Sequence, residues 1–146
     1  MKKIVFLLPL LLTIIMGFVQ VQPNVFPPIP ITEQALLGEW KLEKVESYDV
    51  NNSLKNTITT SNKETIIRLS PQNKITVIEN SLINEQGISD QHKWYLKNSY
   101  LLLKRTDIEI PLKINSLTQK STVLEMINPK ATDREYKALI YLTKIK

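Results

Sequence analysis

The chain has 146 residues, of which 42% are hydrophobic and none is cysteine. This length suffices for one domain that folds without covalent cross-links. The absence of cysteine excludes disulfides, thiolate metal sites, a cysteine nucleophile and the lipidated cysteine of a lipoprotein. Setting Lys2 and Lys3 aside lowers the formal charge from +5 to +3. Because the other lysines are mixed with carboxylates along the chain, we expect no nucleic-acid partner.

The first 20 residues have the pattern of a signal peptide. Lys2 and Lys3 give a positive start, and residues 4–19 are almost entirely apolar. This stretch is shorter than the 18 or more residues of a spanning helix, and Pro9 interrupts it. We predict a bacterial-type export signal at residues 1–20, with an uncleaved anchor as the alternative. The protein would then be periplasmic or extracellular and contact the membrane through this segment alone.

A proline-rich segment follows the export signal. Four prolines fall between residues 23 and 30, and proline favours an extended chain that resists helix and sheet pairing. We predict that residues 21–31 form a linker between the membrane surface and the folded domain. The alternative is that this segment docks into a partner or across the mouth of its own domain.

The predicted folded domain covers residues 32–146 and begins with a helical turn at residues 33–37. Thr32 is a suitable N-cap for this turn, and Gly38 is suited to end it. Further along, the polar stretch at residues 51–63 predicts a long loop.

The first strand begins at residue 39. Trp40 and Leu42 share one face, whereas Val45 belongs to that face only if the alternation changes phase between them. A β-bulge inserts one extra residue and shifts the phase in this way. We therefore predict a bulge near Glu43.

Seven further segments have strand patterns and are separated by turn sequences, at residues 65–69, 75–79, 93–97, 100–104, 108–117, 121–127 and 136–145. Together with the first strand they make eight segments joined by mostly short connections. An up-and-down meander orders them without crossings, and closure into a barrel removes exposed edges. The predicted fold class is all-β, an eight-stranded antiparallel up-and-down barrel with a short N-terminal helical turn.

Several motifs resemble those of the lipocalin-like domains, in the family's order. The sequence LGEWKL at residues 37–42 is similar to the Gly-x-Trp opening of the family's first strand. Residues 67–75, 92–101, 117–124 and 141–144 resemble its later hairpins and closing strand. The resemblance is to small secreted bacterial lipocalin-like domains and covers most of residues 33–146. It implies a β-barrel that binds a small apolar molecule, without naming the molecule.

Two features depart from the family. In lipocalins an arginine near the C-terminus packs over the first-strand tryptophan, whereas this closing strand offers Lys144. Residues 132–136, TDREY, are similar to a Thr-Asp-x-x-Tyr element of the family but stand directly before the last strand. We interpret this second match as a coincidence.

Few residues support catalysis or metal binding. His92 is the single histidine, and no Gly-x-Ser-x-Gly motif is present. Glu85, Asp90 and His92 could ligate a metal, but a lone histidine beside a loop is typical of the surface. We predict no catalytic residue, no metal and no cofactor.

We expect the domain to act by binding. The leading hypothesis is capture of a small apolar or amphipathic ligand inside the barrel. The residues that we predict as its apolar wall are Trp40, Leu42, Ile67, Trp94, Leu96 and Tyr141.

Two alternatives remain open. The first is a filled barrel that acts as a protein-interaction or envelope-maintenance module, with an exposed apolar patch around Tyr95, Tyr100 and residues 23–30. The second is an enzyme, which would need two of Asp107, Glu109 and Glu125 to face one another inside the barrel. The inward or outward direction of each strand residue separates these alternatives.

Overall fold

The structure, a computed structural model, describes residues 26–60, 64–80, 92–105, 108–129 and 136–146. The predicted export signal at residues 1–20 and the first part of the predicted linker lie outside the described residues. No described helix is long and apolar enough to cross a membrane. The elements are α2 (Glu33–Leu36), β1 (Gly38–Tyr48), β2 (Leu54–Thr59), β3 (Glu64–Ser70), β4 (Lys74–Asn80), β5 (His92–Lys97), β6 (Tyr100–Arg105), β7 (Ile108–Leu117), β8 (Ser121–Ile127) and β9 (Lys137–Lys144).

The strands form a closed antiparallel barrel, which confirms the predicted fold class. β1 and β3 to β9 follow one another around the ring, and pairing of β1 with β9 closes it. Such an up-and-down barrel is compatible with a lipocalin-like fold. Among the described residues, β4 and β5 share a single register pair, Lys74 opposite Lys93, which is fewer than any other two neighbouring strands of the ring.

The predicted helical turn is confirmed. The hydroxyl of Thr32 accepts a hydrogen bond from the backbone N–H of Ala35 at 3.1 Å, as an N-cap does. Gly38 follows the turn with a φ of +126°, a backbone conformation that residues other than glycine rarely adopt. The turn places Leu36 in the core, with 1% of its surface exposed.

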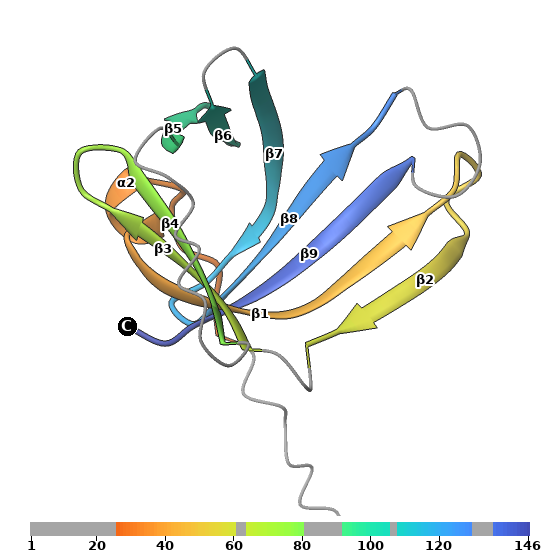
Figure 1. Cartoon of the computed structure of the whole chain (residues 1–146), viewed down its shortest axis with the longest axis horizontal. Helices are drawn as coiled ribbons and strands as arrows, with labels where there is room; N and C mark the ends of the chain where they lie inside the picture. Colours follow the sequence, from red (N-terminus) through yellow and green to blue (C-terminus); the bar gives the residue numbers. More distant parts are fainter. Residues whose placement is uncertain (1–25, 61–63, 81–91, 106–107, 130–135) are drawn as a thin grey trace, which may run out of the picture.

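The predicted bulge in β1 is also confirmed, and it lets this strand pair with three others. The register between β1 and β9 shifts between Leu42 and Lys44. Before the bulge, β1 pairs with β3, and after it, β1 pairs with β2. Figure 1 shows β8, β9, β1 and β2 running side by side away from the remaining strands. We call these four strands the fan.

The prediction of a loop over residues 51–63 is wrong, because β2 lies within it. A turn precedes β2, in which the Asp49 carboxylate accepts hydrogen bonds from the backbone N–H groups of Asn51 and Ser53 and pairs with Lys55 at 2.8 Å. All six residues of β2 are exposed. A strand at the edge of a sheet has no buried face to impose alternation on the sequence, so its polar composition hid it.

Residues 26–31, predicted as the end of the linker, contact the barrel. The backbone N–H of Ile29 donates to the carbonyl of Leu117 at 2.9 Å, and Ile29 and Ile31 pack against the core. The ammonium group of Lys120 lies 4.6 Å from the centroid of the Phe26 ring. This part of the proline-rich segment is therefore seated on the end of the barrel at the β7–β8 turn.

The base of the barrel is built around Trp40, which is 1% exposed. Its indole N–H donates to the carbonyl of Leu36 at 2.8 Å and so fixes α2 across this end. Lys144 lies directly opposite Trp40 in the β1–β9 register, with its ammonium group 5.0 Å from the indole centroid. The same ammonium group donates to the carbonyl of Ala35 at 3.0 Å. Lys144 thus packs over the first-strand tryptophan.

Substitutions of Lys144 should distinguish the contribution of its charge to stability from that of its aliphatic chain. We expect Lys144→Met to lower the free energy of unfolding by about 1–2 kcal/mol, because it removes the cation–π contact and the hydrogen bond to Ala35. Lys144→Arg keeps a cation and should lose less than Lys144→Met. Urea denaturation of the three proteins measures the difference, and equal losses in both variants would contradict this role for the charge.

Gly38→Ala should be destabilising for a different reason. An added Cβ would overlap the backbone carbonyl oxygen of Lys146, and the backbone conformation itself costs alanine about 1–3 kcal/mol. The carbonyl of Lys146 also accepts a hydrogen bond from the backbone N–H of Glu39. We expect a lower melting temperature by circular dichroism. A melting temperature equal to that of the wild type would contradict both the overlap with the chain end and the backbone cost.

Candidate functional site

The interior of the barrel contains a small apolar cavity. Its volume is about 30 Å³, whereas one water needs roughly 10–15 Å³ and a cavity that binds benzene about 150 Å³. Most of its wall consists of inward-facing strand residues, and Leu36 and Trp40 close its base. The lining residues are Leu36, Trp40, Ile67, Leu69, Ile75, Leu101, Leu103, Leu112, Thr122, Leu124 and Leu142.

The cavity wall offers no free polar group to a ligand. Thr122 is its one hydroxyl residue, and that hydroxyl donates to the carbonyl of Ser116 at 2.8 Å. Within the described part of the chain, every buried side-chain nitrogen and oxygen has a hydrogen-bond partner. A ligand in this cavity would therefore be held by apolar contact alone.

An apolar row leads out of the cavity along the inner face of the fan. Directly opposed residues of antiparallel strands share a face, and the register joins Leu124 to Ile140, Ile140 to Val45 and Val45 to Ile58. Leu124 lines the cavity, whereas Ile58 is 56% exposed. One row of the inner surface thus stays apolar from the cavity to the free edge of the fan.

A second apolar extension lies on β7. Ile110 is directly opposite Leu103, which lines the cavity, and Ile108 follows on the same face. Ile110 is 40% exposed and Ile108 is 61% exposed. Exposed apolar side chains that continue a cavity wall are typical of a binding surface. We call Ile58, Ile108 and Ile110, with Val45 and Ile140, the mouth residues.

Two of the six predicted wall residues line the cavity. These are Trp40 and Ile67. Leu42 and Leu96 are half-buried and pack against the core. Trp94 is buried at 1% exposure, and its indole N–H donates to the carbonyl of Ser70 at 3.1 Å, which ties β5 to the end of β3. A role in ligand contact stays a prediction for all of them.

The structure places the sixth, Tyr141, away from the predicted wall. Tyr141 pairs with Lys44, whereas its neighbours Ile140 and Leu142 face inward, so Tyr141 is on the outer face. Both faces of β9 are apolar in sequence, and alternation alone did not tell them apart. Its hydroxyl binds Glu46 instead.

Sequence reasoning missed the mouth residues. Ile58 fell in the predicted loop, and Ile108 and Ile110 were not singled out because a barrel pattern does not tell which end flares. Three consecutive leucines in β6 also carry no alternation, so the sequence alone did not tell that Leu101 and Leu103 face inward while Leu102 faces outward.

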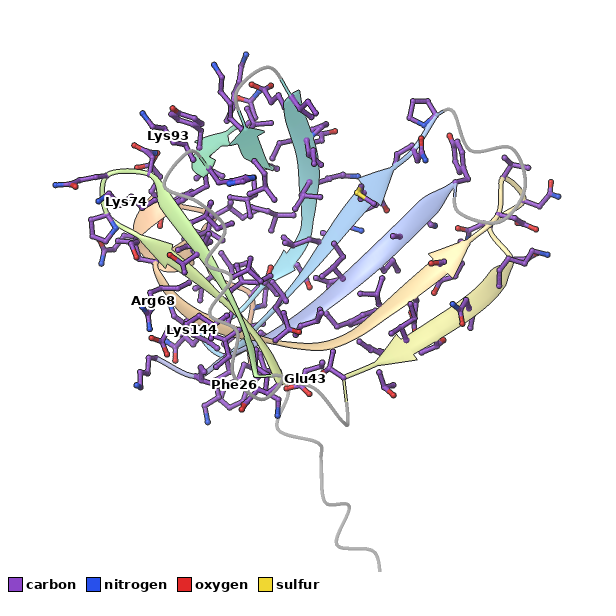
Figure 2. All side chains as sticks on the ribbon, viewed as in Figure 1. Phe26, Glu43, Arg68, Lys74, Lys93 and Lys144 are labelled. Atoms are coloured by element: carbon purple, nitrogen blue, oxygen red, sulfur yellow. The ribbon has the colours of Figure 1, made fainter. Side chains whose placement is uncertain are left out.

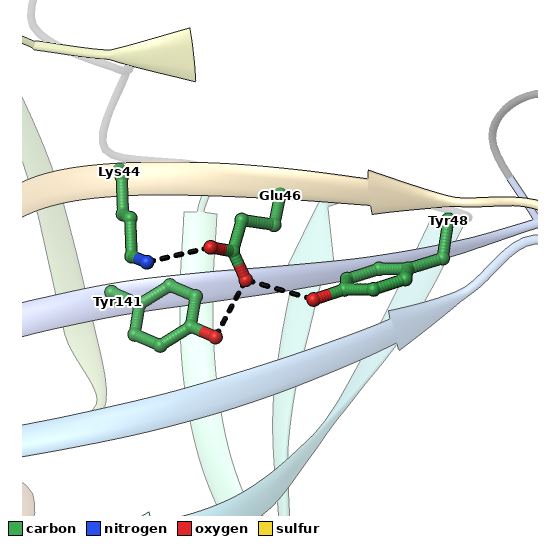
Figure 3. A network of polar contacts seen from close by, with 4 residues as sticks. All are labelled: Lys44, Glu46, Tyr48 and Tyr141. Atoms are coloured by element: carbon green, nitrogen blue, oxygen red, sulfur yellow. Dashed lines mark hydrogen bonds and ion pairs between the residues drawn. The ribbon is translucent and has the colours of Figure 1, made fainter. Parts of the chain in front are cut away.

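A polar cluster on the outer face joins β1 to β9 (Figure 3). The Glu46 carboxylate accepts hydrogen bonds from Lys44 Nζ at 2.6 Å, from the Tyr141 hydroxyl at 2.7 Å and from the Tyr48 hydroxyl at 2.9 Å. The Lys44 ammonium group also lies 4.2 Å from the centroid of the Tyr141 ring. These contacts connect the two central strands of the fan beyond the bulge.

The cluster fixes its own protonation state. The hydrogen bond from Lys44, followed by those from Tyr141 and Tyr48, lowers the pKa of Glu46 from 4.5 to about 2. The hydrogen bond to Glu46 in turn raises the pKa of Tyr141 to about 12. Near neutral pH, Glu46 is ionised and Tyr141 is protonated, so neither is poised to exchange a proton.

The carboxylates considered for catalysis do not meet inside the barrel. Glu109 is directly opposite Lys104 and Glu125 is opposite Lys113, and both glutamates are on the outer face. Asp107 lies outside the described residues. So do Glu85 and Asp90, which the metal hypothesis combined with His92 in β5. Among the described residues, no cluster of three metal-ligating side chains is present.

The comparisons with known proteins add no assignment to this geometry. No protein-family model and no curated protein matches the chain.

The Glu46 cluster predicts a specific dependence of stability on acid. Because the pKa of Glu46 is lower in the folded protein than in the unfolded chain, the unfolded chain binds more protons between about pH 4.5 and pH 2. Stability from this group is therefore present above that window and is lost as the pH falls through it. We expect Glu46→Gln to unfold at a lower temperature at neutral pH and to show a shallower loss on acidification.

The control is Glu43→Gln. Glu43 is exposed on the same strand, and its side chain makes no hydrogen bond or ion pair with the described residues. Melting temperatures measured from pH 7 to about pH 2 should then fall in parallel for Glu43→Gln and the wild type. Parallel curves for Glu46→Gln and the wild type would contradict the assignment.

Proposed function

We propose that this domain binds an apolar or amphipathic small molecule, with the apolar end of the ligand in the barrel cavity and its remainder along the mouth residues. The observation that carries the proposal is the apolar row from Leu124 in the cavity to Ile58 at the edge of the fan. Exposure of inner-facing apolar residues to water is unfavourable, and a ligand that covers them lowers the free energy of the system.

The size of the cavity determines how the ligand would lie. At about 30 Å³ it is far smaller than a whole ligand. It can take the end of a chain, while the larger part of the molecule would contact Ile108, Ile110 and Ile58. A ligand with an extended apolar portion and a polar end fits this arrangement best, because the mouth also opens to water.

The small cavity also favours the alternative of a filled barrel that binds a protein through the exposed mouth. The two functions differ in what they need from the cavity. A protein partner would cover the mouth residues without entering the barrel, whereas a small ligand requires both.

We further propose that the protein works outside the cytoplasm. The support is the charged start and the apolar stretch of residues 1–20, which have the pattern of an export signal. An apolar ligand in that compartment would need a carrier, because apolar molecules are poorly soluble in water.

Binding of N-phenyl-1-naphthylamine, a small uncharged fluorescent probe, tests the proposed function. We expect saturable enhancement of its fluorescence by the wild-type protein. Ile58→Asp and Ile110→Asp should each weaken binding about tenfold, since a buried isoleucine contributes about 1.5–3 kcal/mol. Both side chains are exposed, so the fold should tolerate the changes.

Ile127→Asp is the matched control. Ile127 is 49% exposed in β8 but pairs with Lys137 on the outer face of the fan. It should bind the probe as the wild type does. Leu103→Trp, which would fill the cavity from its wall, should weaken probe binding if the ligand enters the barrel. Probe binding that is unaffected by Leu103→Trp but lost in Ile58→Asp would support the protein-interaction alternative.

A further inference from the structure

Five lysines that are scattered along the chain meet on one outer face of the barrel. The register places Lys74 opposite Lys93 and Lys93 opposite Lys104, which makes one row across β4, β5 and β6. A second row on the same face joins Lys97 to Tyr100 and Tyr100 to Lys113. All five lysines are exposed, and Figure 2 shows Lys74 and Lys93 on the same side of the molecule. We call these five residues the lysine face.

The lysine face is costly for the folded protein by itself. Like charges directly opposite one another on a sheet are destabilising. Within the described residues, none of the five ammonium groups takes part in an ion pair. Two carboxylates, Glu109 and Glu125, lie at its border, opposite Lys104 and Lys113. Among the described residues, the face therefore carries more lysines than carboxylates, and an anionic partner would neutralise this excess of positive charge.

An apolar row separates the two rows of lysines. Tyr95 is opposite Leu102, and Leu102 is opposite Pro111, all on the outer face. Tyr100 in the second lysine row is 42% exposed. The partner must therefore bind the lysine ammonium groups and also cover a strip of aromatic and aliphatic surface.

We propose that the lysine face docks on the surface of a bilayer that contains anionic phospholipid. Lysines near such a surface are attracted to its headgroups, and tyrosine and aliphatic side chains between them can enter the interface. A nucleic acid would also neutralise the charges. However, a surface that binds nucleic acid is expected to carry aromatic side chains for base stacking, whereas this strip contains Leu102 and Pro111. The sequence predicted membrane contact through residues 1–20 alone, because the lysines become neighbours only in the folded sheet.

This inference does not depend on ligand binding in the barrel. The mouth residues face inward and the lysine face is on the outside, so either function can fail while the other holds. The neutral probe used for the barrel carries no charge that the lysines would attract.

Lysine reactivity in the full chain tests the proposal. The chain is reconstituted with vesicles of phosphatidylcholine, or of equal parts phosphatidylcholine and phosphatidylglycerol, and treated with a water-soluble acetylating ester. Mass spectrometry of peptides then gives the acetylation rate of each lysine. Residues 1–20 can attach the chain to both kinds of vesicle, so the comparison isolates the effect of lipid charge.

We expect the five lysines to react several-fold more slowly on anionic vesicles than on neutral ones. Lys55 in β2 and Lys120 in the β7–β8 turn lie elsewhere on the barrel, are exposed, and should keep their rates. Salt at about 1 M, where the Debye length is about 3 Å, should remove the protection. Equal protection of all seven lysines, or protection of none, would overturn the proposal.

Paired substitutions sharpen the test. Each lysine near an anionic surface strengthens association about fivefold, so Lys93→Gln with Lys104→Gln should weaken docking about 25-fold and abolish protection of the other three lysines. Lys55→Gln with Lys120→Gln removes the same charge and should leave that protection intact. The same result in both double variants would show a mere effect of net charge. Protection by duplex DNA at a lower phosphate concentration than by vesicles would assign the face to nucleic acid and overturn the membrane proposal.

Discussion

The fold depends on the pairing of β1 with three other strands. Its first half completes the ring between β3 and β9, while its second half leaves β3, keeps β9 and gains β2. The bulge between Leu42 and Lys44 makes this possible, because it bends the strand and changes which residues face inward. One extra residue therefore both closes the base of the barrel and opens its other end into the fan.

The closed base explains the Gly-x-Trp motif in physical terms. Gly38 has no Cβ, which lets the last residue of the chain pass beside it, and Trp40 spans the base and holds α2 through its indole N–H. Lys144 comes from the strand that closes the ring and covers the same indole. The motif and the closing strand thus form one contact between the two ends of the domain. A lysine serves there because one ammonium group can both lie over the ring and reach a carbonyl of α2.

Local sequence patterns predicted those elements that contain a cap, an alternation of apolar residues or flanking turn residues. The helical turn, the bulge and all eight strands of the ring follow from caps, alternation and turn residues near them in the chain. β2 was missed because an edge strand needs no buried face, and Tyr141 was placed inward because both faces of β9 are apolar. The size of the cavity and the grouping of five lysines depend on how distant strands pack and pair. No local pattern contains that information, since it arises from register between segments far apart in sequence.

Strand alternation also explains how β6 and β7 could take part in both proposed functions. Inward residues of β6 and β7, such as Leu101, Leu103 and Leu112, line the apolar cavity, while the residues between them place lysines and a tyrosine outside. Because successive side chains point to opposite faces, a substitution on one face leaves the chemistry of the other unchanged. If both proposals hold, the same strands bring the barrel to an anionic bilayer and form part of the wall that receives an apolar chain. The cavity would then work close to a source of such chains, and a ligand would need to cross little water to reach it.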